Sequence, residues 1–306
     1  GLFTVFIWIE TVWPRSEEPA TLARVVIAYS LLTWTAMTLY GAEVWLRNGE
    51  ALSVAFALFG RFAPLGPGGE RSLVLRPWGA GLVADVPLSP SQTIFVALML
   101  GSVTFDGLME TEAWMIVVNG IFETDAAFPA LVALRDLFGT ALIGIESLAM
   151  AAFPWVLLAI LLAVMRLMRA ILSRHDTWSL AGRIAPTLLP IAIAYHVAHY
   201  LSFLAIAGQL AIPLASDPFG YGWDLFGTAG RVVDPGLFTA GTAWFVALGA
   251  IVVGHVIAVV LGHVAMQAAA PSPRAANLAH LPLLALMVAY TVLSLWILAQ
   301  PILATP

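Results

Sequence analysis

Long apolar runs constrain the fold of this 306-residue chain more than any other feature. The runs can cross roughly 30 Å of hydrocarbon, and segments rich in Pro, Gly and acidic residues separate them. The pattern predicts a single all-α domain, a polytopic transmembrane helix bundle of about six to seven spans, and not a barrel, whose strands would alternate in hydrophobicity. The predicted spans are 21–46, 91–110, 139–172, 179–213, 237–268 and 277–300, with a partial helix over 1–13. Because that partial helix is too short to span and lacks an initial Met, we expect an earlier portion of the chain to precede it.

The connections between the runs predict an orientation. In the connection 47–90, apolar residues recur at helical spacing between Glu50 and Arg61, which predicts an amphipathic helix on the membrane surface. All 13 basic residues are Arg, and alternation of the spans places nine of them on the side that holds this connection and 164–184. The positive-inside rule makes that side cytoplasmic. The Gly-, Asp- and aromatic-rich loop 214–236 then faces outward.

Composition excludes several classes of function. The chain is 61% hydrophobic and only 10% charged, so the lipid bilayer is its expected environment. It has no Cys, which excludes thiolate metal sites and cysteine nucleophiles, and no Lys, which excludes a retinal-type Schiff base. A net charge of −5 without a basic stripe gives no footprint for nucleic acid, and we expect no nucleic-acid partner.

Ionisable residues inside the apolar runs are the strongest functional signal. His196 and His199 lie three residues apart in LLPIAIAYHVAHYLSFLAIAG, on one face of a helix. Counting about 1.5 Å per residue along each predicted span places Asp106, Glu146 and His255 with them in the middle and outer half of the bundle. Unpaired charges at that depth are costly, so we expect mutual pairing or metal coordination.

This set of residues is suited to a divalent metal, most simply zinc, with an open position for water. A metal-bound water would act as the nucleophile, with Glu146 or Asp106 as acid or base and Tyr195 as an orienting or oxyanion-stabilising group. The function predicted on this basis is hydrolysis of a lipophilic small-molecule (phospho)ester. The predicted ligands are His196, His199, His255 and Asp106.

Other interpretations stay open. Each histidine could be a neutral hydrogen-bonding group that adds specificity to helix packing. His199 and His255 could be axial ligands of haem b, or ligands of copper, in an electron-transfer subunit. The carboxylates and histidines could also relay protons in a transporter or an accessory subunit of a larger complex. His263 and His280 fall toward the cytoplasmic side and could form a separate pair.

Four strings resemble a family of bacterial, largely actinobacterial, multi-pass membrane proteins described as fenitrothion hydrolase-like. They are AEVWLRNGEALSVAFALFGRFAP at 42–64, SVTFDGL at 102–108, YHVAHYLSFLAIAGQ at 195–209 and SDPFGYGWDLFGTA at 216–229. The resemblance implies a bacterial plasma-membrane protein linked to hydrolysis of organophosphorus triesters and working with a second membrane subunit. Metal-activated water suits that chemistry as well, as it does in ceramidase-like and adiponectin-receptor-like membrane hydrolases, although those carry HxxxH and this chain has HxxH.

Overall fold

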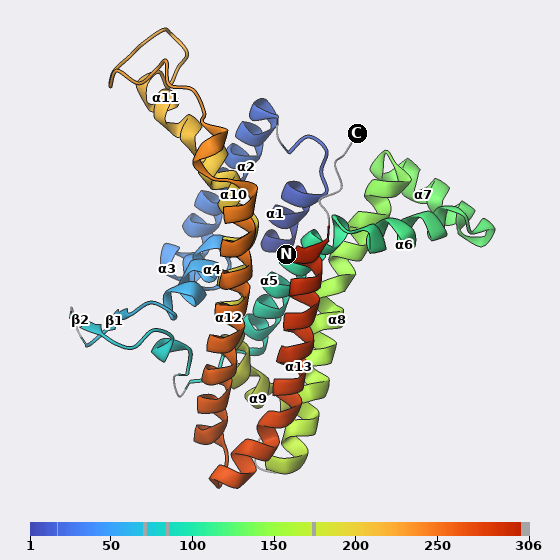
Figure 1. Ribbon diagram of the computed structural model, residues 1–306, viewed down its shortest axis with the longest axis vertical. Coiled ribbons are helices and arrows are strands. Elements are labelled where there is room, and N and C mark those ends of the chain that lie inside the picture. The colour runs from blue at the N-terminus through green and yellow to red at the C-terminus, as the bar shows by residue number, and fades with distance from the viewer. Residues whose placement is uncertain (17, 70–71, 84–85, 173–175, 301–306) are drawn as a thin grey trace.

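Six long apolar helices form the framework of the protein (Figure 1). The computed structural model describes residues 1–16, 18–69, 72–83, 86–172 and 176–300. Each framework helix is long and apolar enough to cross a membrane, which confirms the predicted all-α multi-pass bundle. They are α2 (Pro19–Tyr40), α5 (Pro90–Met109), α8 (Ala141–Leu172), a bent helix over Thr177–Ser216, α12 (Ala240–Ala269) and α13 (Pro273–Ala299).

The bent helix over Thr177–Ser216 is made of several pieces, because Pro186, Pro190 and Pro213 each remove a backbone donor. Pro186 lies in the 3₁₀ turn η3, and Pro190 and Pro213 lie in the first turns of α10 and α11, where a missing N–H is tolerated. The pieces are α9 (Thr177–Ile184), η3 (Ala185–Leu188), α10 (Leu189–Ile206), η4 (Ala207–Leu210) and α11 (Ala211–Ser216).

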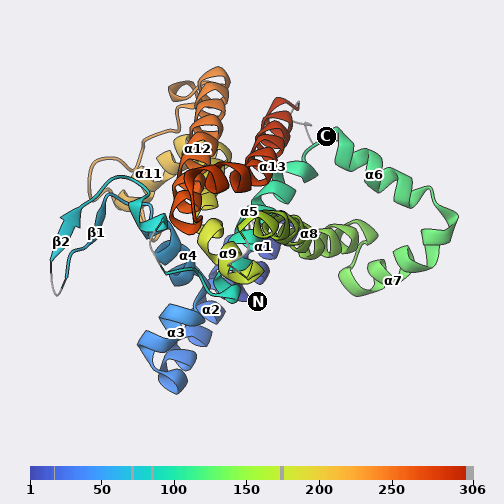
Figure 2. The same cartoon turned by 90° about the horizontal axis from the view of Figure 1, so that it is seen from below.

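Shorter elements surround this framework. Two helices, α6 and α7, bend by 79° at 123–124, and both ends of the pair lie at one end of the bundle, next to α5 and α8 (Figure 1). Seen from below, this pair and the two-stranded ribbon project to opposite sides (Figure 2). The elements are α1 (Leu2–Thr11), α3 (Ala42–Asn48), α4 (Ala51–Gly60), β1 (Leu65–Pro67), β2 (Leu73–Leu75), η1 (Ala80–Leu82), α6 (Glu112–Phe122), η2 (Asp125–Ala127), α7 (Phe128–Phe138) and η5 (Pro235–Leu237).

Small residues allow the central helices to approach closely. A Cβ atom added at Gly254 of α12 would lie 2.4 Å from the Cβ of Ala194 and 2.8 Å from the carbonyl oxygen of Pro190, both in α10. A Cβ at Gly101 of α5 would lie 2.6 Å from the Cα of Pro154 in α8. Such close contacts stabilise helix association in lipid, where the hydrophobic effect does not drive helices together.

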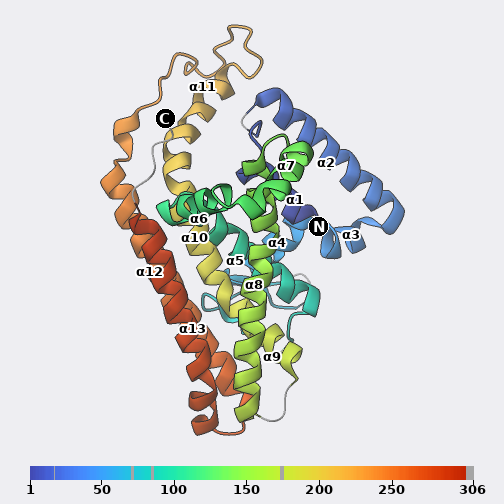
Figure 3. The same ribbon diagram turned by 90° about the vertical axis from the view of Figure 1, so that its right-hand side faces the viewer.

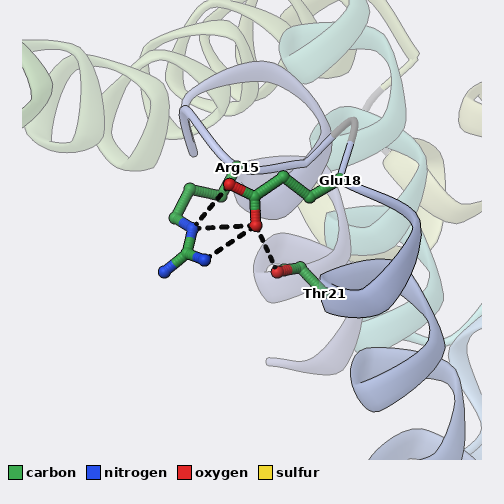
Figure 4. A network of polar contacts seen from close by, with 3 residues as sticks. All are labelled: Arg15, Glu18 and Thr21. Carbon is green, nitrogen blue, oxygen red and sulfur yellow. Dashed lines mark hydrogen bonds and ion pairs between the residues drawn. The ribbon is translucent and has the colours of Figure 1, made fainter.

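The helix α2 stands apart from the central helices (Figure 3). Only 6% of its span is buried within the chain. Its start is held by a turn in which Arg15 and Thr21 both bind the carboxylate of Glu18, at 2.8 and 2.9 Å (Figure 4). Hydrogen bonds from Arg15 and then Thr21 lower the pKa of Glu18. Further along, the hydroxyl of Tyr29 donates to Glu50 in the turn before α4.

The two ends of the bundle differ in charge. One end, where α8 finishes and α13 begins, carries Arg166, Arg169 and Arg274. The end of the connection before α5 packs against the same half, since the Leu88 N–H donates to the carbonyl of Gly182 in α9 at 2.9 Å. The predicted outer loop extends beyond α11 at the other end (Figure 1).

Candidate functional site

One carboxylate and one imidazole from different spans meet near the end of the bundle opposite the arginine-rich end. Oδ2 of Asp106 in α5 lies 3.1 Å from Nε2 of His199 in α10. The two side chains are 17% and 32% exposed, so the chain encloses the pair largely but not completely. Gly107 lets α5 come close here, because a Cβ at that position would lie 3.0 Å from Ile297 in α13. Of the residues predicted as a metal shell, these two are in contact.

Two further carboxyl groups surround the pair. The hydroxyl of Tyr200, which follows His199 in α10, donates to Glu10 at the end of α1. The rings of His199 and Tyr200 are in edge contact, with centroids 4.7 Å apart. Glu10 and Glu110 both interact electrostatically with Asp106. The site therefore gathers three carboxyl groups around one imidazole.

Glu10 is the member of this site that sequence reasoning missed. It ends the partial helix over 1–13, where a single acidic residue looks like a marker of the membrane surface. The available signal was topological, because α1 and α5 both run toward the same end of the bundle and so bring Glu10 and Asp106 to similar depth (Figure 1).

The other two predicted histidine ligands each direct Nδ1 to a backbone carbonyl of their own helix. Nδ1 of His196 lies 2.7 Å from the carbonyl oxygen of Ala192, and Nδ1 of His255 lies 2.8 Å from that of Ile251. Within the described residues, no group of three or more His, Asp or Glu side chains is arranged to hold a metal ion. The donor set in contact is thus smaller than a zinc shell requires, and zinc, haem and copper stay predictions.

Glu146, predicted as the acid or base, has no contact with Asp106 or His199 among the interactions of the described residues. It is half-buried in α8, next to Ser147, whose hydroxyl accepts a 2.7 Å hydrogen bond from Trp8. The carboxyl groups that act on Asp106 within the described chain are Glu10 and Glu110. The catalytic role of Glu146 therefore stays a prediction without a contact to support it.

Tyr195 lies deeper in the bundle than His199. Its side chain is buried, and its hydroxyl lies 3.7 Å from the position of a Cβ at Gly107, the residue after Asp106. That hydroxyl makes no well-formed hydrogen bond within the described residues, although it interacts with the hydroxyl of Ser294 in α13. Tyr195 is therefore near the pair, and its predicted role as an orienting group stays a prediction.

A second histidine pair lies near the arginine-rich end. The rings of His263 in α12 and His280 in α13 have centroids 5.2 Å apart, which confirms that these two residues are neighbours. Nε2 of His263 lies 2.9 Å from the amide nitrogen of Gln267. The two sets of histidines are thus separate, as the count of residues along the helices predicted.

The chain matches no protein family model, no curated protein sequence and no solved structure. The resemblance to fenitrothion hydrolase-like proteins therefore stays a prediction, as do the hydrolytic activity and the second membrane subunit that it implies. What the protein does must be inferred from the side chains that its helices bring together.

Proposed function

We propose that this multi-pass protein binds and transfers protons in a membrane, as a transporter or as an accessory subunit of a larger complex. The observation that carries the proposal is the 3.1 Å contact between Asp106 and His199 across two spans. Ionisable residues inside spans are costly and typically mark ion or proton pathways. We place the protein in a bacterial plasma membrane with the arginine-rich end in the cytoplasm.

The chemistry of the pair suits this role. With Asp106 ionised, Nε2–H of His199 donates to the carboxylate, so a proton arriving from outside binds Nδ1, and the carboxylate stabilises the imidazolium that forms. Glu10 and Glu110 add negative charge around the same site. A neighbouring acceptor or water then takes a proton from the imidazolium, which restores the neutral ring, so no net chemical change is needed in the protein.

Metal-dependent hydrolysis is less well supported, because it needs a third ligand beside His199 and Asp106. His196 and His255 would each have to turn away from a backbone carbonyl to supply one. Elemental analysis of the purified protein separates the two functions. About one zinc per chain, lost in His199→Ala, would favour the hydrolase and contradict the present proposal.

The direct test is proton movement in sealed proteoliposomes that contain a pH-sensitive dye. An inward proton gradient, with potassium and valinomycin to balance charge, should acidify vesicles that hold the wild-type protein. Asp106→Asn should lower the rate by about 100-fold, the range typical of removing a proton-transfer group. Asp136→Asn is the matched control, since Asp136 is an exposed residue of α7. Equal rates in empty and wild-type vesicles, or in the two variants, would overturn the proposal.

A further inference from the structure

Seven buried side-chain polar atoms lack a well-formed hydrogen bond within the described residues, and three of them belong to the central helices α10, α12 and α13. They are the hydroxyl of Tyr195 in α10, Nε2 of His255 in α12 and Nε2 of His280 in α13. Their residues are only 6%, 4% and 7% exposed. Buried polar groups are nearly always paired, so three such atoms within adjacent helices call for an explanation.

The first two of these atoms extend the Asp106–His199 site inward. The Tyr195 hydroxyl interacts with the hydroxyl of Ser294 in α13 and electrostatically with Asp106, and Tyr290 interacts in turn with Tyr195. The hydroxyl of Tyr290 shares a hydrogen bond with Thr104, two residues before Asp106 in α5. The rings of Tyr290 and His255 have centroids 5.8 Å apart. Polar side chains from four helices therefore continue from the outer pair to the middle of the bundle.

His255 is oriented to accept a proton. Its Nδ1 lies 2.8 Å from the carbonyl oxygen of Ile251, an acceptor, so Nδ1 carries the ring proton of the neutral imidazole. Nε2 then presents a lone pair to the bundle interior. A proton from a water molecule can form a bond to Nε2, and breaking the same N–H bond passes the proton onward and restores the neutral ring.

An apolar cavity interrupts the route below this level. It has a volume of about 30 Å³ and lies between α5, α8, α13 and the η3–α10 segment, with Tyr290 as its one polar lining residue. Met287 separates Tyr290 from the third buried atom, because Met287 lines the cavity and also packs at Gly262, where His280 Nε2 lies. A cavity of this size has room for about one water molecule, but apolar walls keep such spaces dry.

We propose that Tyr195, Tyr290, His255 and His280 form an internal proton route from the Asp106–His199 site to the arginine-rich end, gated by the apolar cavity. The inference rests on the proposed function. Of these four residues only Tyr290 lines the cavity, so the route is complete when water fills the cavity and Met287 moves aside to let water continue toward His280, and it is broken when Met287 closes and the cavity is dry. The gate keeps the two sides of the membrane from being connected by a permanent leak.

Variants along the route test it in the same proteoliposomes. Tyr195→Phe keeps the ring and removes the hydroxyl, and His255→Leu removes the acceptor nitrogen. Each should abolish transmembrane proton flux, whereas Tyr221→Phe in the exposed outer loop should leave it unchanged. Wild-type flux that is lost in His199→Ala but unchanged in both inner variants would overturn the route and leave the proposed function standing. No flux in the wild type would overturn both.

A variant that raises proton flux is a stronger test, because a protein that fails to fold can lose flux but cannot gain it. Leu286→Ser places a hydroxyl in the cavity wall and should raise proton flux several-fold. Leu281→Ser is the control, because Leu281 lies on the same helix and is 55% exposed on the outside of the bundle. The double variant Leu286→Ser, His199→Ala should lose the gain, since protons must still enter at the outer pair. Unchanged flux in Leu286→Ser, or a gain that survives in the double variant, would contradict the gate.

Discussion

At the scale of single residues, Glu50 shows how a buried carboxylate is held without a cation. It is 6% exposed and accepts hydrogen bonds from the backbone N–H groups of Leu52 and Ser53 at 3.0 and 2.5 Å, and from the hydroxyl of Tyr29. Burial opposes ionisation, but hydrogen bonds from Ser53 and Tyr29 outweigh it and hold the pKa of Glu50 below its ordinary value of 4.5. Glu50 thus caps α4 and ties α2 to it.

Because the pKa is lowered in the folded state, ionised Glu50 stabilises the fold above pH 4.5, and the contribution is lost as the pH falls through the folded pKa. Glu50→Gln should therefore lower the free energy of unfolding by about 1 kcal/mol at neutral pH. The difference from wild type should shrink below pH 4.5. Thermal unfolding in detergent measures it, with exposed Glu43→Gln as the control. A pH-independent difference would contradict the assignment.

For single residues, the sequence predicted how deep an ionisable side chain lies in the bundle, but not toward which neighbour the side chain points. Counting residues along helices put Asp106 and His199 at one level, and they are in contact. The same count gives no rotation about a helix axis. His196 and His255 have the right depth, but each turns Nδ1 to the carbonyl four residues earlier in its own helix.

At the scale of elements, helix limits followed the apolar runs closely, and the exceptions have local causes. The predicted span 21–46 ends at Tyr40, because Gly41 has a φ of +85° that breaks the helix before α3 resumes. The bend between α6 and α7 was not predicted, since each half is apolar and only the turn at 123–124 separates them. Contacts between spans, in contrast, depend on small residues whose partners lie far away in the sequence.

Gly254 is the clearest of these contacts. Gly254→Ala would force a Cβ to within 2.4 Å of Ala194 and push α12 away from α10. We expect it to lower the free energy of unfolding by about 2 kcal/mol, the usual cost of overpacking. Gly249→Ala on the same helix meets nothing within 4 Å and should not destabilise the protein. Equal thermal unfolding temperatures for the two variants in detergent would show that the close approach of α10 and α12 is wrong.

At the scale of the whole molecule, charge and connectivity agree on a direction across the membrane. Alternation of the helices divides the connections into two sets, one on each side of the membrane, but does not say which set is cytoplasmic. The distribution of arginine predicts it, because arginine concentrates where α8 ends and α13 begins. The same asymmetry would give the proposed proton route its direction, with the carboxyl-rich Asp106–His199 site at the opposite end as its proposed entrance.

The absence of Cys from the sequence makes this direction directly testable. Val232→Cys lies in the loop beyond α11 and is 84% exposed, whereas Pro271→Cys lies in the exposed turn between α12 and α13. In intact cells, a membrane-impermeant maleimide should label the first variant and not the second. Both should be labelled once the cells are made permeable, which shows that each thiol is reactive. Labelling of Pro271→Cys alone in intact cells would reverse the orientation, and would make the Asp106–His199 pair the exit of the route instead of its entrance.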